Sequence, residues 1–391
     1  MRGAEAVLAC LREQDVDTVF GYPGGMILPL YDALYGQTEI RQILVTHEQN
    51  AAHAADGYAR ATGRVGVCIA TSGPGATNLV TGIATAYMDS IPMVAITGQV
   101  DLEMLGRDAF QETDILDVTM PVTKHNYKIK NATDLVPTIR EAFALARSGR
   151  PGPVLIDVPR NLFFEEVAYA EQKREERRPG KPDADFAICA AEAAAEIVNA
   201  ERPLVIVGGG VISAGASAQT IAFIEKYKLP VVHTLMGMGG IPSTHPQMLG
   251  FIGMHGAKTA NYAVGAADLV IALGSRFADR QTGNLSKFTA NRKFIHIDID
   301  PAEIDKIVGS SIGLAGDMCV ILNLLMRQAP KSDYAAWWQQ LHTWQEEFAY
   351  DYHSDALSVP WALNQVARMT AGKAYAYATD VGQHQMWAAL H

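Results

Sequence analysis

Strand-like apolar runs alternate with helix-like segments through the first half of the chain. Runs over 40–45, 65–71, 92–97 and 154–158 each end in a turn of polar residues, glycine or proline. The most apolar of them, 65–71, is of the kind that is buried on both faces of a parallel sheet. Because strands alternate with helices, the pattern predicts an α/β fold with doubly wound parallel-sheet domains.

Helices are predicted on both sides of a short strand at 18–20. Apolar residues at positions 6, 7, 10 and 11 recur at helical spacing, and 28–34 is a second apolar segment of helical character. Between the strand and the second helix lies a Pro-Gly-Gly turn, 23–25. Glycines at the end of a strand let the backbone approach a ligand closely, although most such turns are only turns.

The stretch 45–60 predicts an alanine-rich helix with one carboxylate, Glu48, in its first turn. Thr46 is the expected N-cap and Gly63 the expected C-terminal stop. The helix dipole favours a carboxylate at this end. These residues alone favour an ordinary capped surface helix. Glu48 nevertheless follows a predicted strand, and the carboxyl ends of such strands are where open α/β sheets bind ligands.

A second α/β unit is predicted after residue 186. A helix over 187–200 precedes strands over 203–207, 230–233, 269–273 and 294–298, and glycine or aspartate follows each strand. The turn at 208–215 lacks the G-x-G-x-x-G pattern, because Ser213 stands at the third glycine position. Strand-end amides together with Arg276 suit a phosphate-bearing nucleotide, but ordinary turns would look the same.

The remaining segments connect these units. The proline-bounded stretch 171–182 mixes both charge signs and predicts a solvated linker. The stretch 332–352 predicts a helical connection into a third unit, which begins with a helix over 361–370 and a strand over 375–380. One strand and one helix cannot bury a core, so we expect the third domain to be cut short.

Composition narrows the class of function. The 391-residue chain has a formal net charge of −10 and a pI near 5.6, which argues against a nucleic-acid partner, because phosphate binding needs clustered Lys and Arg. Its four cysteines form no C-x-x-C pair, so neither a zinc site nor a disulfide framework is indicated. No apolar run reaches the roughly 20 residues of a membrane span. No export signal is evident, so a cytoplasmic location is expected.

Short motifs rich in glycine and polar residues follow one another in a fixed order. They are GYPGG at 21–25, HEQ at 47–49, GYARATG at 57–63, ATSGPGATN at 70–78, AITGQ at 95–99, DAFQE at 108–112, SGRPGP at 148–153, TLMG at 234–237, GMHG at 253–256, RF at 276–277 and GQHQMW at 382–387. In this order the motifs resemble the thiamine-diphosphate-dependent enzymes, and among them the large catalytic subunits of acetolactate synthase (acetohydroxyacid synthase).

The resemblance implies four segments. Residues 1–165 correspond to a pyrimidine-binding domain, 166–185 to a linker, and 186–330 to a central FAD-associated domain. Residues 331–391 correspond to a connection and the truncated start of a diphosphate-binding domain. The family binds Mg²⁺, and through it the diphosphate, at a Gly-Asp-Gly motif. No such motif occurs before His391, so no residue here is assigned to a metal.

The resemblance also implies roles for individual residues. Glu48 corresponds to the glutamate that hydrogen-bonds N1′ of the cofactor's aminopyrimidine, and the implied catalytic set is Glu48, Gln111, Gly25 and Phe110. The implied thiamine diphosphate contacts are Pro23, Gly24, Glu48, Pro74, Asn78, Val381, Gly382, Gln383 and His384. The implied FAD contacts are Arg150, Gly208, Gly209, Gly210, Thr234, Leu235, Met236, Gly253, Met254, His255, Gly256, Gly274, Arg276, Asp279, Asp298, Ile299, Gly316 and Asp317.

The implied reaction is the decarboxylation of pyruvate and transfer of its two-carbon unit to a second 2-keto acid, pyruvate or 2-ketobutyrate, in branched-chain amino-acid biosynthesis. A homodimer or homotetramer, with a small regulatory subunit, is the implied assembly. The alternatives are a pyruvate oxidase-like enzyme, a glyoxylate carboligase, which Glu48 disfavours, and a truncated FAD- or partner-binding chain without activity. The chain departs from the family pattern in its charges at Asp101, Glu103 and Arg107, and at Ala278 in the flavin loop.

Overall fold

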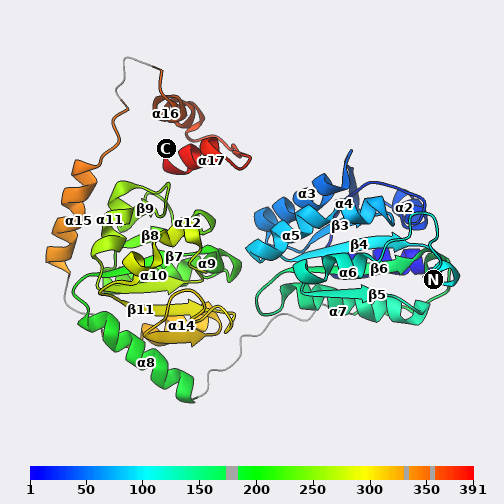
Figure 1. The fold of residues 1–391 in the computed structure, drawn as a ribbon, viewed down its shortest axis with the longest axis horizontal. Coiled ribbons are helices and arrows are strands. Elements are labelled where there is room, and N and C mark those ends of the chain that lie inside the picture. Colours follow the sequence, from blue (N-terminus) through cyan, green and yellow to red (C-terminus); the bar gives the residue numbers. More distant parts are fainter. Residues whose placement is uncertain (173–183, 330–333, 353–356) are drawn as a thin grey trace. The chain divides into compact units, whose positions relative to one another are not determined.

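The computed structural model describes residues 1–172, 184–329, 334–352 and 357–391, and it forms two compact units that divide at residues 177/178 (Figure 1). Most of the predicted linker, 173–183, lies outside the described residues. Each unit is a parallel sheet covered by helices, which confirms the predicted fold class. Among the described residues no helix is both long and apolar enough to cross a membrane.

The first unit contains a six-stranded parallel sheet in the order β2-β1-β3-β4-β6-β5. Its strands are β1 Thr18–Gly21, β2 Arg41–Leu44, β3 Gly66–Ala70, β4 Met93–Gln99, β5 His125–Lys128 and β6 Pro153–Pro159. Every residue of the three central strands β3, β4 and β6 is buried, as their position between two helical layers requires. Five of the six strands were predicted. The polar edge strand β5 was not.

Helices cover both faces of this sheet. They are α1 Gly3–Glu13, α2 Leu28–Tyr35, α3 Glu48–Thr62, α4 Pro74–Asn78, α5 Val80–Asp89, α6 Ile115–Thr119 and α7 Leu135–Arg147. Apolar residues of α1, α2 and α7 form one core with the sheet, and those of α3, α4, α5 and α6 form a second core on the other face. The turns that follow the strands therefore lie between two helical layers, at the sheet's carboxyl edge.

The helix that carries Glu48 begins one residue later than the N-cap prediction required. His47 is the N-cap, and its Nδ1 accepts a hydrogen bond of 3.1 Å from the amide of Gln49. The prediction of Thr46 as the cap is therefore wrong, because the helix starts at Glu48 and the cap is the residue just before it. The predicted stop is confirmed: Gly63 closes the helix with φ of 69°, a conformation that glycine adopts without strain.

The second unit has its own six-stranded parallel sheet, in the order β12-β11-β10-β7-β8-β9. Its strands are β7 Pro203–Val207, β8 Val231–His233, β9 Met248–Phe251, β10 Leu269–Leu273, β11 Lys293–Asp298 and β12 Ile312–Ala315. Its helices are α8 Ala184–Asn199, α9 Gly209–Ser213, α10 Ser217–Tyr227, α11 Lys258–Ala266, α12 Asp279–Thr282, α13 Leu285–Thr289, α14 Met318–Leu325 and α15 Ala335–Glu347. Four of the strands were predicted, whereas the edge strands β9 and β12 were missed.

The predicted connection over 332–352 contains helix α15, which packs onto this unit. Trp337 and Leu341 are buried in the unit's core, and Trp337 Nε1 donates a 3.1 Å hydrogen bond to the carbonyl of Pro203. Helices α16 Val359–Thr370 and α17 Gln383–Leu390 follow, and they contact each other. The predicted strand at 375–380 is wrong. Those residues are exposed and pair with no strand, and a strand needs a neighbour for its backbone hydrogen bonds.

A charged cluster joins α3 to α5 in the first unit. Asp56 on α3 is 4% exposed and forms an ion pair with Arg60 one turn later. The same guanidinium donates from Nη2 to Asp89 at the end of α5, at 2.8 Å. Arg60 therefore neutralises a buried carboxylate and links two helices.

We expect Arg60→Met to destabilise the first unit by about 2 kcal/mol, because Asp56 would keep a buried charge without its partner. Hydrogen exchange of the β3 amides measures this free energy. Arg64→Met is the matched control, since Arg64 pairs with Asp17 at the surface, where both side chains are about half exposed. A similar loss of stability in both variants would show that the burial of Asp56 does not increase the contribution of its ion pair.

Candidate active site

Glu48 lies at the carboxyl edge of the first sheet, at the start of α3. It is only 9% exposed, and its Oε2 accepts a 2.9 Å hydrogen bond from Asn78 Nδ2 at the end of α4. Among the described residues no group donates a hydrogen bond to Oε1. The carboxylate is therefore held by one oxygen, while the other is available to a ligand.

Glycine keeps the space beside that oxygen open. A Cβ on Gly75 would lie 3.2 Å from Glu48 Oε1 and 2.8 Å from Thr71 Cγ2. A Cβ on Gly24 would lie 2.5 Å from the same methyl group. A side chain at either glycine would therefore collide with Thr71. At Gly25, by contrast, a Cβ would meet no atom within 4 Å, so this residue borders open space.

Thr71 was not singled out from the sequence, although it joins the two glycine turns. It follows β3 directly, and its Oγ1 accepts a 3.2 Å hydrogen bond from the amide of Met26. Its methyl group fills the space between Gly24 and Gly75. The available signal was its place between a buried strand and a Ser-Gly-Pro-Gly turn. The predicted contacts Pro23 and Pro74 stand beside these glycines in the same two turns.

The loop 100–113 brings Gln111 to this edge and leaves Phe110 exposed. The carbonyl oxygen of Gln111 would lie 2.6 Å from a Cβ on Gly73, so the loop contacts the Ser-Gly-Pro-Gly turn. Gln111 has φ of 59°, in the left-handed region that non-glycine residues rarely adopt. Such backbone strain persists where surrounding contacts enforce it, and it concentrates at functional sites. Phe110 is 81% exposed.

Asp157 is a second buried carboxylate of the first unit, and sequence reasoning missed it. It lies on β6, is fully buried, and accepts hydrogen bonds from Thr97 Oγ1 at 2.7 Å and Gln99 Nε2 at 3.0 Å. Burial raises the pKa of Asp157 to about 6, although these two hydrogen bonds act in the opposite direction. An acidic residue in an otherwise apolar strand was the available signal.

The residues predicted for FAD in the second unit collect along one edge of its sheet. Gly208 follows β7, Thr234 follows β8, Gly253 follows β9, Gly274 follows β10, and Asp298 ends β11. Because all six strands are parallel, these positions share the carboxyl edge, which is where such sheets bind nucleotides. The predicted residues named here therefore lie at the edge where open α/β sheets bind nucleotides, and their role toward FAD stays a prediction.

Close backbone packing explains the glycines at that edge without a ligand. A Cβ on Gly208 would lie 2.1 Å from the carbonyl oxygen of Gly274, and one on Gly210 would lie 2.6 Å from Gly274 Cα. A Cβ on Gly256 would lie 2.5 Å from the carbonyl oxygen of Phe251. Asp317 caps α14 by accepting from the amide of Val320. These residues lie where FAD is predicted to bind, but the close contacts of the glycines and the capping role of Asp317 are also explained by the fold alone.

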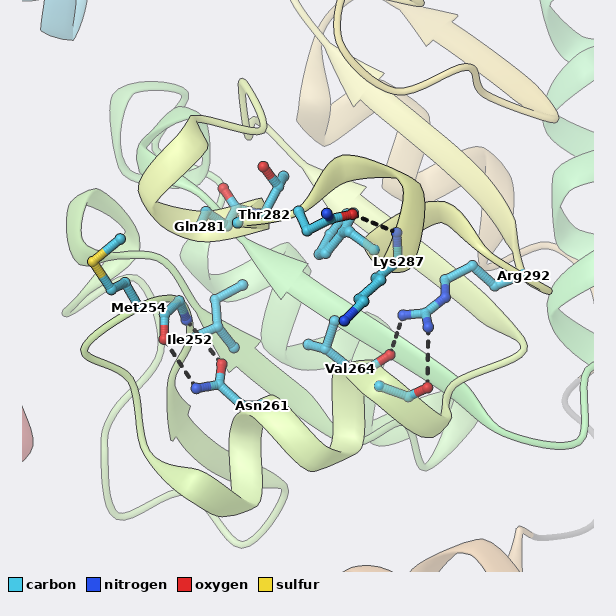
Figure 2. Close-up of a pocket in the computed structure, with 13 residues that line it drawn as sticks. Ile252, Met254, Asn261, Val264, Gln281, Thr282, Lys287 and Arg292 are labelled. Atoms are coloured by element: carbon cyan, nitrogen blue, oxygen red, sulfur yellow. Dashed lines mark hydrogen bonds between the residues drawn. The ribbon is translucent and has the colours of Figure 1, made fainter.

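A cavity of about 340 Å³ lies beside this edge, between α11, α12 and α13 (Figure 2). Of the predicted FAD contacts, Gly253 and Met254 line it. Two of the polar side chains that line it already form hydrogen bonds with the backbone. Asn261 exchanges two 2.9 Å hydrogen bonds with the backbone of Gly253, and Arg292 donates to the carbonyls of Val264 and Gly265. The cavity thus overlaps the predicted FAD site at one loop only.

Some predicted residues belong to the other unit than the rest of their set. Arg150, predicted for FAD, belongs to the first unit, where its Nε donates a 2.7 Å hydrogen bond to Ser90 Oγ. The predicted thiamine diphosphate contacts of the C-terminal segment belong to the second unit, at the start of α17, and Val381 is 83% exposed. The structure therefore leaves these assignments as predictions.

Comparison with known proteins gives a consistent result. Residues 1–118 match the family model described as thiamine pyrophosphate enzyme, N-terminal TPP binding domain, and residues 190–325 match thiamine pyrophosphate enzyme, central domain. The acetolactate synthase large subunit of Haemophilus influenzae is 45% identical over all of this chain and 70% of its own length. For acetolactate synthase isozyme 3 large subunit of Escherichia coli the identity is 44%, again over 70% of that protein. The acetolactate synthase large subunit of Parasynechococcus marenigrum is 46% identical, and the chain spans 65% of its length.

We expect Asp157→Asn to remove a pH dependence of stability. Because the folded-state pKa of about 6 lies above the free value of 3.8, the wild type should lose stability relative to the variant as the pH rises from about 4 to above 6. The loss should reach about 3 kcal/mol, at 1.36 kcal/mol per pKa unit. Hydrogen exchange of the β4 and β6 amides at both ends of this range measures it.

The control for this experiment is Asp117→Asn, at an exposed position of α6. In this variant the free energy of unfolding should change between the two pH values by the same amount as in the wild type. If the difference in unfolding free energy between the wild type and Asp157→Asn is the same at both pH values, the raised pKa of Asp157 is contradicted.

Proposed function

The chain belongs to the acetolactate synthase large-subunit family of thiamine pyrophosphate enzymes, and we propose that its first unit activates thiamine diphosphate for acetolactate synthesis. One observation carries the proposal: Glu48 is buried, held through Oε2 by Asn78, and open at Oε1 beside Gly75. A carboxylate fixed through one oxygen can hold and exchange a proton at the other. That is the role of a general acid–base group, and it suits a ring nitrogen.

In the proposed site, Oε1 of Glu48 would hold the aminopyrimidine of thiamine diphosphate by a hydrogen bond to N1′ and would carry the proton of that bond. Thiamine diphosphate, when bound, supplies the electron sink that lets pyruvate lose carbon dioxide and transfer its two-carbon unit. Asn78 keeps the carboxylate in one orientation. Pro23, Gly24 and Pro74 would provide the backbone walls around the bound cofactor. Gly25, Phe110 and Gln111 line the channel through which the 2-keto acids enter.

We place FAD at the carboxyl edge of the second sheet. Most of the residues predicted from the resemblance collect there, and this is the edge at which parallel sheets of this kind bind nucleotides. FAD is proposed to take no net part in the reaction. Mg²⁺ completes the proposed cofactor set. Among the described residues no cluster of three or more His, Cys, Asp or Glu side chains could hold a metal ion, so we assign no Mg²⁺ ligand to them.

The substrates we propose are pyruvate and a second 2-keto acid, pyruvate or 2-ketobutyrate, in branched-chain amino-acid synthesis in the cytoplasm. The related proteins are named large subunits, which supports a small regulatory partner for this protein. We also propose a homodimer or homotetramer. Because the chain spans 65–70% of these relatives, activity is to be tested on the whole protein as the organism makes it.

Glu48→Gln should lower kcat for acetolactate formation from pyruvate at least about 100-fold, because the amide keeps the shape of the side chain but cannot exchange the proton. The assay contains thiamine diphosphate, Mg²⁺ and FAD. Full activity of this variant would refute the role of Glu48. If pyruvate bleaches the bound flavin, a pyruvate oxidase-like reaction replaces our proposal. A yellow, folded wild type that is inert toward pyruvate indicates a binding protein.

Gly75→Ala should reduce kcat by about tenfold or more and destabilise the first unit by about 1–3 kcal/mol, since the added methyl group overlaps Thr71 and approaches Glu48 Oε1. Kinetics and hydrogen exchange measure the two effects. Gly57→Ala in α3 is the matched control, because a Cβ there meets no atom within 4 Å. It should stabilise the helix by about 0.5–1 kcal/mol and leave kcat unchanged. Equal kinetics in both variants would contradict the crowding argument.

A further inference from the structure

The loop 100–113 is closed at its base by one side chain, that of Gln99. Gln99 ends β4 and is 1% exposed. Its Oε1 accepts a 2.9 Å hydrogen bond from the amide of Val100, and its Nε2 donates a 3.0 Å hydrogen bond to the carbonyl of Thr113. A single amide group therefore contacts the first and the last residue of the loop that carries Gln111.

Asp157 fixes the orientation of this amide. Its Oδ2 accepts a 3.0 Å hydrogen bond from the same Nε2, and Thr97 Oγ1 donates to its Oδ1 at 2.7 Å. An ionised carboxylate only accepts hydrogen bonds, so it selects the NH₂ side of Gln99. With the amide flipped, Oε1 would face a carboxylate and a carbonyl, and the amide of Val100 would face a donor. Only one orientation therefore satisfies both ends of the loop.

Hydrogen bonds within the loop stabilise its shape. The carboxylate of Glu112 accepts hydrogen bonds from the amides of Gly106 at 2.5 Å and Ala109 at 2.9 Å. Near its start, the amide of Leu102 donates to Asn161 Oδ1 at 3.0 Å. The Glu112 contacts hold the loop's own shape, whereas Asn161 holds its start from outside, so the position of its far end, at Thr113, depends on Gln99.

We propose that Gln99, oriented by Asp157, is a positioning residue that pins both ends of the loop 100–113 and so fixes Gln111 against Gly73. The geometry of the pinning is independent of the reaction. Its effect on catalysis rests on the proposed function, in which Gln111 lines the substrate channel. Neither Gln99 nor Asp157 contacts the Glu48 carboxylate through any hydrogen bond of the described residues, so the two parts of the site can be tested separately.

Gln99→Met in the whole protein tests the proposal through limited trypsin digestion. Arg107 is exposed in the loop, and cleavage after it reports how often the loop opens. Losing hydrogen bonds to a carbonyl, an amide and a carboxylate should speed this cleavage about tenfold or more. In the same variant kcat/KM for pyruvate should fall by a similar factor. The apparent affinity for thiamine diphosphate should stay within about twofold, because the Asn78–Glu48 hydrogen bond is untouched.

The matched control is Gln37→Met. Gln37 closes a turn in the same way, since Nε2 donates to the carbonyls of Leu34 and Ile40 and Oε1 accepts from the amide of Ile40. This variant should leave both cleavage after Arg107 and kcat/KM unchanged. Equal acceleration in both variants would mean general loosening of the unit and would overturn the proposal.

Two further variants keep the test decisive. If Gln99→Met does not fold, Gln99→Asn keeps an amide that is too short to reach both ends, and it should also speed cleavage after Arg107. Asp157→Asn should accelerate that cleavage by a smaller factor, about threefold, because a neutral acceptor replaces a charged one. Wild-type cleavage rates in these variants overturn the proposal. Faster cleavage combined with full activity of Glu48→Gln supports the pinning and overturns the proposed function.

Discussion

Parallel strands deliver all their carboxyl ends to one edge of a sheet, and both units place their candidate residues there. In the first unit this edge holds Glu48 and the turns after β1 and β3, while in the second it holds the turns after β7 to β12. The space available to a ligand at each edge depends on how closely the turns pack against one another. The parallel strands bring the turns together, and glycines allow their backbones to approach closely.

Three buried carboxylates in the first unit are stabilised in three different ways. Asp56 is neutralised by Arg60, whereas Asp157 is held by two neutral donors, which only partly offset the rise of its pKa that burial causes. Glu48 has one neutral donor and one oxygen with no donor among the described residues. A buried carboxylate that the protein leaves half satisfied is the one that a ligand completes. This contrast separates the structural acids from the candidate catalytic one.

The central strands and most helices could be predicted, because continuous apolar runs and helical spacing are local signals. The edge strands β5, β9 and β12 could not, since an edge strand needs less apolar surface and β5 reads as polar. The N-cap was placed one residue early, and 375–380 has strand character without a partner. In the site, motif resemblance led to Glu48, Gln111 and the glycine turns. The roles of Thr71, Gln99 and Asp157 depend on contacts between distant segments, which no local pattern encodes.

The interlocked group of Gly24, Thr71 and Gly75 has a consequence for how this protein can change. One methyl group occupies the space that two absent side chains leave, so no member can enlarge unless another shrinks. The three positions are therefore epistatic: a substitution that harms the protein alone becomes neutral beside a second one. Such coupling restricts the routes along which the sequence can drift and preserves the space beside Glu48 Oε1 while surrounding residues vary.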